Sequence, residues 1–465
     1  MSPTRVQSYR DGEQDGADFY HFRYGGVSLR ADAEFGGLTV MSLTAVRRMH
    51  ADYAVDLDRG PLPLLTSDPR ARQEQFSQEI QLQSTEPAPF HWVAGLYFLD
   101  IEERYKPTPF DYGGSYSAGL GGRLRQTIFS RGDATSYAAY GQATMPIHDA
   151  TTLTLGLRYT IEDRSIAANA ERLFDNAPFV RPIPGLPLLS QAPRRDSASF
   201  DELTWRVSLN HPFSDEVKGY LSANRGFQSG GWNLQTPQNP AFRPERLDDF
   251  EAGLKYVDRS RRFRADANIF YYDYSDLQVS AFTQVGSTTT NAASAEVYGL
   301  ELQLGVRPDR DTDVTIGAQL LKTRFKAFPN ASCTNFSAGA ATPYAPISCV
   351  ATGNDFPFAP EFKVNAGISR QIPLGRIGSL ELSANLSYNS GYYAEPDNIV
   401  RQDGFATVDA SVEWRPGGRG PSVRLWVLNL TDTHYYESLA TVATVGAFQS
   451  PAAPRRVGVS VVTSF

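Results

Sequence analysis

The residues that most often carry chemistry are few in this chain and far apart. Its 465 residues include six histidines and two cysteines. A metal site needs several ligands at close spacing, and a nucleotide site needs a Gly-rich loop between a strand and a helix. Neither pattern is present, and no segment fits the turn that presents a nucleophilic serine. The sequence therefore indicates no catalytic, cofactor-binding or metal-ligating residues, and composition alone leaves a Ser-His-Asp arrangement open. The histidines are His21, His50, His91, His148, His211 and His434.

The two cysteines, Cys333 and Cys349, lie in one irregular stretch, 326–361. Two cysteines that bracket such a stretch are typical of a disulfide in an oxidising compartment, and of free thiols in a reducing one. Zinc is disfavoured because no histidine or further cysteine lies nearby.

A second set of residues could bind a ligand without reacting with it. These aromatic and basic residues occur in irregular stretches, where aromatic walls and polar donors together favour a small-molecule vestibule. The alternative is that each of them packs loops together or lies at a membrane interface. The candidates are Tyr112, Tyr116, Arg225, Trp232, Phe282, Tyr344, Tyr392 and Tyr393.

The elements that must position these residues are strands. The last stretch shows the pattern well: Val457, Val459 and Val461 alternate with Gly458, Ser460 and Val462, and the chain ends at Phe465. A period of two with one apolar face predicts a half-buried strand. An aromatic at the very end fits the last strand of a membrane barrel, whose ends meet an aromatic girdle; the alternative is an edge strand of a soluble sheet.

The rest of the chain is predicted to form strand pairs joined by tight turns rich in Gly, Pro and Asp. Each strand is about 10–14 residues long, whereas strands of soluble sheets usually have 5–6. Short turns at one end and long connections at the other are typical of outer-membrane barrels. The predicted pairs are 24–34 with 37–53, 73–85 with 90–105, 134–145 with 150–162, 199–211 with 216–226, 245–257 with 263–277, 295–307 with 312–325, 362–372 with 379–390, and 406–414 with 422–435. The long connections are 54–72, 106–133, 163–198, 227–244, 278–294, 326–361 and 436–453.

Composition agrees with this class of protein. The mean hydropathy is -0.35, and no apolar run approaches the roughly 18–20 residues of a membrane helix. The formal net charge of -7 argues against nucleic acid as the partner, because such proteins usually carry a basic stripe. The first residues show no charged and then apolar segment typical of a signal peptide.

Several segments together resemble the C-terminal β-barrel of TonB-dependent outer-membrane receptors, especially the siderophore and iron-complex class. Residues 250–255 (Phe-Glu-Ala-Gly-Leu-Lys) and 298–302 (Tyr-Gly-Leu-Glu-Leu) are similar to family signatures. The order and spacing of the segments make the resemblance specific, and it covers nearly the whole chain. The other segments are 76–82, 92–98, 226–233, 244–245, 429–435 and 454–465.

The resemblance implies an all-β, antiparallel transmembrane barrel that is incomplete, with about 17 of the family's 22 strands. The family's plug domain, signal peptide and TonB box have no counterpart here, so the chain is interpreted as a truncated receptor. Residues 1–23 would be the remnant of an extracellular loop, and 24–465 the partial barrel. Its last strand would have one neighbour, the strand 422–435.

The resemblance also implies the function. The chain would be the barrel of an outer-membrane receptor for ferric siderophores or a similar scarce nutrient, without energised transport of its own. It would perform no bond chemistry and would not be an enzyme. Its partners would be outer-membrane lipid, the nutrient, the barrel-assembly machinery that reads Phe465, and TonB only through the plug; its location would be the Gram-negative outer membrane. In that compartment a disulfide between Cys333 and Cys349 is favoured. The alternatives are a passive porin-like channel and a soluble β-rich carbohydrate-binding protein.

Overall fold

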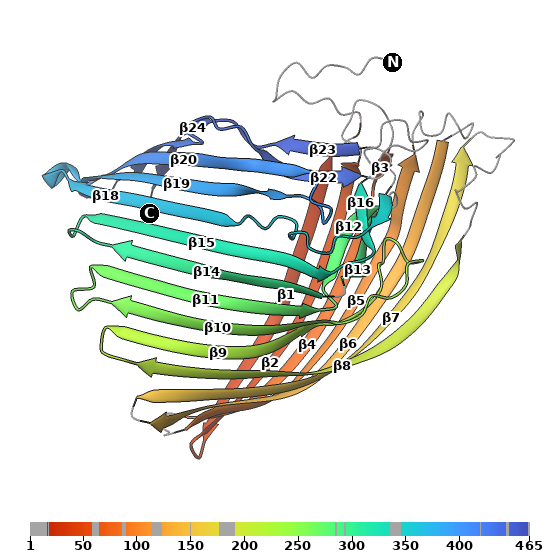
Figure 1. The fold of residues 1–465 in the computed structure, drawn as a ribbon, viewed down its shortest axis with the longest axis horizontal. Helices are drawn as coiled ribbons and strands as arrows, with labels where there is room; N and C mark the ends of the chain where they lie inside the picture. Colours follow the sequence, from red (N-terminus) through yellow and green to blue (C-terminus); the bar gives the residue numbers. More distant parts are fainter. Residues whose placement is uncertain are drawn as a thin grey trace.

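A computed structural model shows an all-β chain built on one large, strongly curved antiparallel sheet (Figure 1). It describes residues 16, 18–57, 65–85, 90–112, 123–148, 150–175, 191–283, 286–292, 294–334, 346–418, 420–442 and 446–463. The sheet has 18 strands, one of which, β3, contains only 3 residues. In hydrogen-bonded order the strands are β1 (Phe19–Phe35), β2 (Leu38–Asp56), β4 (Arg70–Ser84), β5 (His91–Tyr112), β6 (Arg123–His148), β7 (Thr151–Asp175), β8 (Gln191–Pro212), β9 (Val217–Gln228), β10 (Glu245–Val257), β11 (Phe263–Ser275), β14 (Ser294–Val306), β15 (Thr312–Ala327), β18 (Phe362–Pro373), β19 (Ser379–Tyr393), β20 (Arg401–Arg415), β21 (Ser422–Leu428) and β24 (Arg456–Val462), with β3 (Leu65–Ser67) beside β2 and β5.

The predicted hairpin order is correct throughout, and each strand pairs with the next long strand along the chain. The strand edges of the sheet are β1 and β24. Among the described pairings, β1 pairs only with β2 and β24 only with β21. The prediction that the last strand has one neighbour is therefore confirmed for the residues that the structure describes. β1 begins at Phe19, five residues before the predicted start at residue 24.

The two faces of the sheet differ in polarity. The outward face of the sheet carries rows of aliphatic side chains, called here the outward row. In these rows, residues on neighbouring strands lie opposite one another, as Leu155 and Val207 do. Leu157 is 60% exposed and Leu254 54% exposed, as expected for side chains that meet lipid. The alternate residues, such as Arg158 and Glu162 on β7, face the concave side. This polarity is typical of a barrel wall that encloses a polar bore.

Four strands are far longer than predicted. β6 has 26 residues and β7 has 25, and their register continues to Arg123 opposite Asp175. Apolar alternation ends well before this point, so the sequence pattern missed the extension. The hydrogen-bond ladder continues because it satisfies backbone groups in polar segments as well.

Three of the predicted long connections contain small hairpins, which corrects their interpretation as irregular. The connection 278–294 forms β12 (Gln278–Thr283) and β13 (Gly286–Asn291), 326–361 forms β16 (Ala331–Thr334) and β17 (Pro346–Cys349), and 436–453 forms β22 (Tyr436–Val442) and β23 (Gly446–Pro451). A 3-10 turn, Gly375–Ile377, joins β18 to β19.

The predicted strand 422–435 is also too long, because β21 ends at Leu428. Asn429 adopts a φ of 50°, and its side chain makes hydrogen bonds to both backbone groups of Thr433, at 3.0 and 2.9 Å. Asn tolerates the left-handed conformation and bonds nearby backbone, so it ends a strand as a compact turn.

Candidate functional site

The end of the barrel that carries the long connections, called here the long-connection end, holds a segment that folds into the bore. This strap, residues 229–244, joins β9 to β10. Gly231 and Phe242 bond each other through both backbone groups, at 3.0 and 2.8 Å. The small residues at its start allow close approach, since a Cβ at Gly230 would lie 2.8 Å from the Phe200 ring.

The strap reaches strands far from its own. Leu234 lies 3.1 Å from the position that a Cβ would take at Gly132 on β6. Arg194 on β8 donates hydrogen bonds from Nη1 to the backbone oxygens of Pro237 and Asn239, at 2.7 and 2.6 Å. Gln235 makes a hydrogen bond with Tyr53 on β2. The strap therefore crosses the concave side from β9 and β10 toward β2.

A small hairpin holds the strap from the other side. Asn233 donates from Nδ2 to the backbone oxygen of Thr289 on β13 at 3.0 Å and accepts from its N–H at 2.7 Å. The hydroxyls of Thr236 and Thr288 bond at 3.0 Å, and both are buried. The two hydrogen bonds of the Asn233 side-chain amide resemble those between neighbouring strands. Side chains therefore fix the strap in place where the backbone forms no regular sheet.

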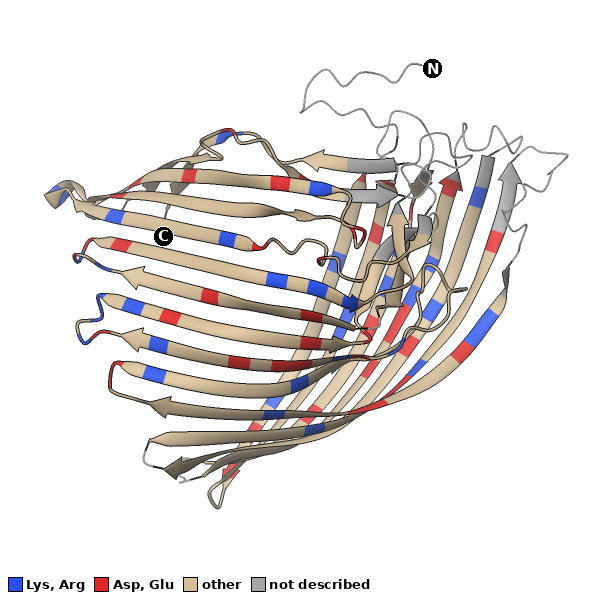
Figure 2. Ribbon diagram, viewed as in Figure 1, with Lys and Arg blue, Asp and Glu red and all other residues tan. Residues whose placement is uncertain are grey.

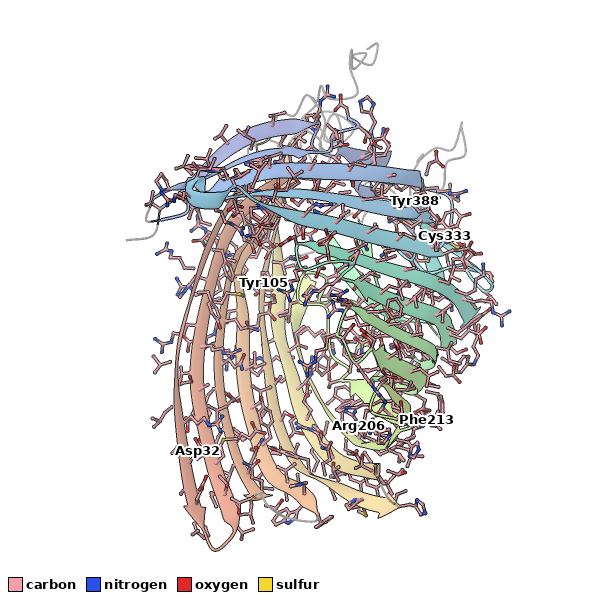
Figure 3. The ribbon with its side chains drawn as sticks, turned by 90° about the vertical axis from the view of Figure 1, so that its left-hand side faces the viewer. Asp32, Tyr105, Arg206, Phe213, Cys333 and Tyr388 are labelled. Atoms are coloured by element: carbon pink, nitrogen blue, oxygen red, sulfur yellow. A yellow bond between two sulfur atoms is a disulfide. The ribbon has the colours of Figure 1, made fainter. Side chains whose placement is uncertain are left out.

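Beside the strap lies a group of phenol, carboxylate and guanidinium side chains on β2, β5 and β7. Burial raises the pKa of Glu103, although a hydrogen bond from Tyr105 and the charge of Arg164 act in the opposite direction. Burial also raises the pKa of Tyr105, with the negative charge of Glu103 as a further cause. Arg164 in turn donates to Glu162 at 2.5 Å. Figure 3 labels Tyr105 on the concave side.

Charges at the long-connection end are matched in ion pairs. Arg131 contacts both Glu102 and Asp133, at 2.9 and 2.7 Å. Further pairs join Arg125 to Asp111, Arg194 to Asp196, Arg246 to Glu202, Arg324 to Glu296, and Lys326 to Asp273. Such a surface offers many fixed hydrogen-bonding groups with little net field, which suits recognition by shape and polar contacts.

A β-bulge changes which residues of β5 face the bore. The register of β5 against β6 shifts between Tyr105 and Thr108, so the residues after it change faces. Phe110 is then 2% exposed and Ile128, on β6, 1% exposed. The backbone of Tyr112 is opposite Leu124 on β6. The prolines of Lys106-Pro107-Thr108-Pro109 were the available signal, because Pro within a strand often marks a bulge.

The other predicted vestibule residues are spread over several places. Trp232 belongs to the strap. The ring of Tyr392 lies 5.4 Å from that of Phe358, and the guanidinium of Arg401 lies 5.7 Å from the ring of Tyr393. Arg225 shares its face of β9 with Leu221, so alternation places it outward, and it holds Asp248 with two hydrogen bonds of 2.7 Å. This position does not favour Arg225 as a vestibule residue.

Some predicted residues cannot be placed in this way. Phe282 lies on β12, where its backbone is opposite Ser287. Tyr116, Tyr344 and Phe465 lie outside the described residues. Sequence reasoning missed Tyr53, Glu103 and Asn233, whose role depends on contacts between distant strands that leave no local pattern.

Cys333 and Cys349 are joined as a disulfide, with Cα atoms 5.9 Å apart. The bond links β16 to β17 beside a small apolar core at the long-connection end of β14 and β15. Phe325 is central to this core, since its ring centroid lies 4.7 Å from that of Phe356 and 5.1 Å from that of Phe328. The buried members are Ala292, Ala295, Phe325, Phe328, Ala331, Cys333 and Ala351.

No catalytic or metal site emerges within the described part of the chain. No group of three or more His, Cys, Asp or Glu residues is placed to hold a metal ion there. In a separate search of the same residues, no helix had the length and apolar character that a membrane span requires.

The apolar outer row, the polar bore, the tight turns at one end and the long connections at the other define the wall of an outer-membrane type β-barrel. The chain belongs to the TonB-dependent receptor family: residues 2–430 match the family model described as "TonB dependent receptor-like, beta-barrel". Members of this family are outer-membrane receptors of Gram-negative bacteria that transport and do not catalyse.

Known proteins agree with this assignment. The chain is 23% identical over 305 residues to the pesticin receptor of Yersinia pestis, an alignment that covers 65% of this chain and 40% of the receptor. The crystal structure of the ferric yersiniabactin uptake receptor FyuA from Yersinia pestis has a TM-score of 0.77 at 19% identity, over 97% of this chain and 62% of that one. The siderophore receptor PiuA from Acinetobacter baumannii has a TM-score of 0.75 at 15% identity, over 99% and 67%. The chain thus spans about two fifths of the length of the pesticin receptor, and the structural matches show a shared fold.

Proposed function

We propose that this chain forms the barrel wall and the ligand-binding mouth of an outer-membrane receptor for ferric siderophores or a similar scarce nutrient. The observation that supports the proposal is the strap, which crosses the concave side at the long-connection end and is held by Arg194 and Thr289. The proposed mouth includes Trp232 of the strap together with Tyr53, Glu103 and Tyr105. Phenols, amides and guanidinium groups held in fixed positions can bind a large polar complex without reacting with it. The related receptors that bind ferric siderophores add support to this choice of ligand.

The proposal has further parts. Outer-membrane lipid surrounds the outward row, and the barrel-assembly machinery recognises the last strand through Phe465. The predicted loop remnant, residues 1–23, lies mostly outside the described residues, and β1 begins within it at Phe19. Energised transport in this family requires a plug and its contact with TonB, and the wall described here would contribute the binding surface.

Binding to the mouth can be measured through the strap itself. The purified chain in detergent micelles would be titrated with ferric complexes of a catecholate, a hydroxamate and a carboxylate siderophore, and tryptophan fluorescence recorded. We expect saturable quenching by one chemical class, and loss of most of this quenching in Trp232→Phe. A Trp205→Phe variant, on the outward face of β8, is the matched control and should quench normally. Absence of saturable quenching by all three classes would contradict the proposal.

The strap also bears on the alternative of a passive channel. A segment fixed to β2, β6, β8 and β13 narrows the bore, so open diffusion of large solutes is disfavoured. Liposome swelling in a neutral oligosaccharide measures this directly. We expect no faster swelling with the chain than with lipid alone, whereas rapid swelling would favour a porin-like function.

A further inference from the structure

The outward face of β8–β11 carries an apolar groove near the tight-turn end. Two adjoining hollows of about 480 and 490 Å³ form this groove, and they share the lining residues Leu209, Leu221, Ala252 and Ile269. Ala252 on β10 lies opposite both Leu221 and Ile269, so a small side chain forms the floor between two large ones. Leu221 and Ile269 are 57% and 59% exposed. The groove therefore belongs to the outer wall, whatever fills the bore.

The length of the groove matches one leaflet of a bilayer. It extends from Phe250, which is opposite Ala223 on β9, to Phe213 in the turn between β8 and β9. The backbone N–H of Phe213 donates to the oxygen of Val217. The stretch of β9 from Ala223 to Val217 is about 20 Å long at roughly 3.3 Å per residue. One leaflet contributes about 15 Å of hydrocarbon, so the groove can accommodate an acyl chain along its length.

Aromatic rings lie between the groove and the tight turns. The ring centroid of Phe213 lies 4.8 Å from that of His211, and the ring centroid of Phe263 lies 5.8 Å from that of Tyr256. Aromatic side chains are enriched where hydrocarbon gives way to the polar headgroups. The headgroup of a lipid in the groove should therefore lie beside the turns that follow these rings.

Two neighbouring turns of opposite charge stand at this place. The turn 258–262, between β10 and β11, contains three arginines, whereas the turn 213–216, between β8 and β9, contains two carboxylates. Figure 2 shows the first turn largely in blue and the second in red. Arg259 of the first turn contacts Glu216 of the second at 3.3 Å. The two turns therefore adjoin, and both charges are within reach of one headgroup.

The remaining charges of these turns are not matched within the described wall. Arg261, Arg262 and Asp215 are exposed, and none of them forms an ion pair with a residue that the structure describes. Asp258 accepts a hydrogen bond from the backbone N–H of Phe263 at 2.6 Å, so this carboxylate holds its own turn. A positive and a negative group thus stay available on adjacent turns.

We propose that the groove binds a phospholipid whose headgroup carries both a phosphate and a primary amine, as a phosphatidylethanolamine does. One acyl chain would lie between Leu221 and Ile269. The phosphate would accept hydrogen bonds from Arg261, because the planar guanidinium matches phosphate oxygens, and the ammonium group would donate to Asp215. The short turns of outer-membrane barrels face the periplasm, which assigns the lipid to that leaflet. The inference rests on the lipid contact of the outward row in the proposed function, and not on nutrient binding at the mouth.

The test uses the full 465-residue chain in a non-ionic detergent. Native mass spectrometry counts the lipids retained and gives their dissociation constants, with dioleoyl phosphatidylethanolamine and dioleoyl phosphatidylglycerol as the two probes. We expect one saturable site that favours phosphatidylethanolamine. In Arg261→Gln both lipids should bind about fivefold more weakly, because each basic residue near a lipid surface contributes about that factor.

A second variant separates the two headgroups. Asp215→Asn removes the partner of the amine, so phosphatidylethanolamine should bind about fivefold more weakly or worse. Phosphatidylglycerol should bind at least as well as before, because a carboxylate that repels its phosphate is gone. The matched control is Arg376→Gln in the turn between β18 and β19, where the arginine is exposed and forms no ion pair with a described residue. We expect both affinities to stay within about twofold of the parent chain.

The groove itself is tested by filling it. Ala252→Leu places a large side chain on the floor, and we expect about tenfold weaker binding of both lipids. Ala318→Leu is the control, because Ala318 is opposite Leu302 and Val364 on β15 and does not line either hollow. Circular dichroism in the same detergent should match the parent chain for both variants, which separates loss of the site from loss of folding.

Several results would overturn the proposal. They are the absence of a saturable phospholipid site, equal weakening in Arg261→Gln and Arg376→Gln, a preference for phosphatidylglycerol in the parent chain, and unchanged binding in Ala252→Leu. A dimer that forms in place of the lipid complex and is lost in Ala252→Leu would assign the groove to a second copy of this chain. The outcome does not depend on the siderophore titration, because neither the lipids nor these residues belong to the strap.

Discussion

The two ends of the barrel are built by different rules. At the long-connection end, arginines are paired with carboxylates, a small core surrounds Phe325, and the strap is held by side-chain hydrogen bonds. At the tight-turn end, ion pairs such as Arg307 with Asp313 lie beside the turns, and Lys218 on β9 is opposite Lys255 on β10. The first end resembles the interior of a soluble protein, where a ligand can meet fixed groups. The second end consists of tight turns with exposed side chains, such as Phe213.

The middle of the wall has a third feature. On the concave face, glycines lie directly opposite rings on the neighbouring strand, as Gly253 does opposite Tyr220. A Cβ at Gly253 would lie 2.2 Å from the ring. The missing side chain lets the ring lie flat on the backbone, so the bore keeps its width. Similar pairs are Gly95 with Tyr140, Gly299 with Phe270, and Gly458 with Trp426.

The largest effect is expected from removing the small core. Phe325→Ala replaces a ring that is 1% exposed, and such changes cost about 3–5 kcal/mol through lost burial and a cavity. Hydrogen exchange of β16 and β17 should accelerate strongly. Phe213→Ala, at a tight turn where the ring is 63% exposed, should leave exchange in these hairpin amides unchanged. Equal effects of the two changes would show that the ends do not differ in packing.

Breaking the disulfide should have the next largest effect. Replacement of Cys333 and Cys349 by serine opens a loop with a sequence separation of 16, which corresponds to about 3 kcal/mol in the chain-entropy model. The change should be confined to the same hairpin and should be visible as faster exchange and faster proteolysis between β16 and β17. Ser332→Ala in that hairpin is the control. Unchanged protection without the bond would mean that the apolar core alone orders this connection.

A smaller effect is expected in the middle of the wall. Gly253→Ala forces the Tyr220 ring off the backbone and disturbs its hydrogen bond to Glu251, at a cost of about 1–2 kcal/mol. Gly317→Ala, on the same face of β15, meets nothing within 4 Å and should be neutral in urea unfolding. If both variants unfold at the same urea concentration, the flat rings do not matter to stability.

The smallest effect concerns the sign of a pH dependence. Burial raises the pKa of Glu103 above the value of 4.5 that is normal for glutamate, so the folded state binds its proton more tightly than the unfolded state. Stability should therefore fall as pH rises from the unfolded pKa to the folded one. Glu103→Gln should be more stable than the parent chain at neutral pH and equally stable at low pH. Unfolding curves at several pH values test this, and a variant less stable at neutral pH would contradict it.

The sequence predicted the wall well because a strand that meets lipid on one side must alternate. Leu153, Leu155 and Leu157 show this alternation clearly. The turns were predictable from their Gly, Pro and Asp residues. The same reasoning failed where alternation is absent, as in the extensions of β6 and β7. It also placed the end of β21 too late. Leu430 and Tyr435 are typical strand residues, but Asn429 already turns the chain.

The site was only partly predictable for a similar reason. Tyr112 and Trp232 were found as aromatics in irregular segments, and both lie at the long-connection end. Arg225 was selected on the same grounds, but its alternation with Leu221 shows an outward position. Asn233 and Gln235 are ordinary polar residues in sequence, and only the folded chain reveals what they hold.

The bulge in β5 has a consequence for how such a mouth can change. Because the bulge absorbs one extra residue between Tyr105 and Thr108, deleting one residue there would give a regular ladder in which Thr108 and Phe110 still face inward. The membrane part of the strand, from His91 onward, would keep its faces and its fit to lipid. The chain can thus change its length by one residue at this point while the lining residues on either side of the bulge keep their faces.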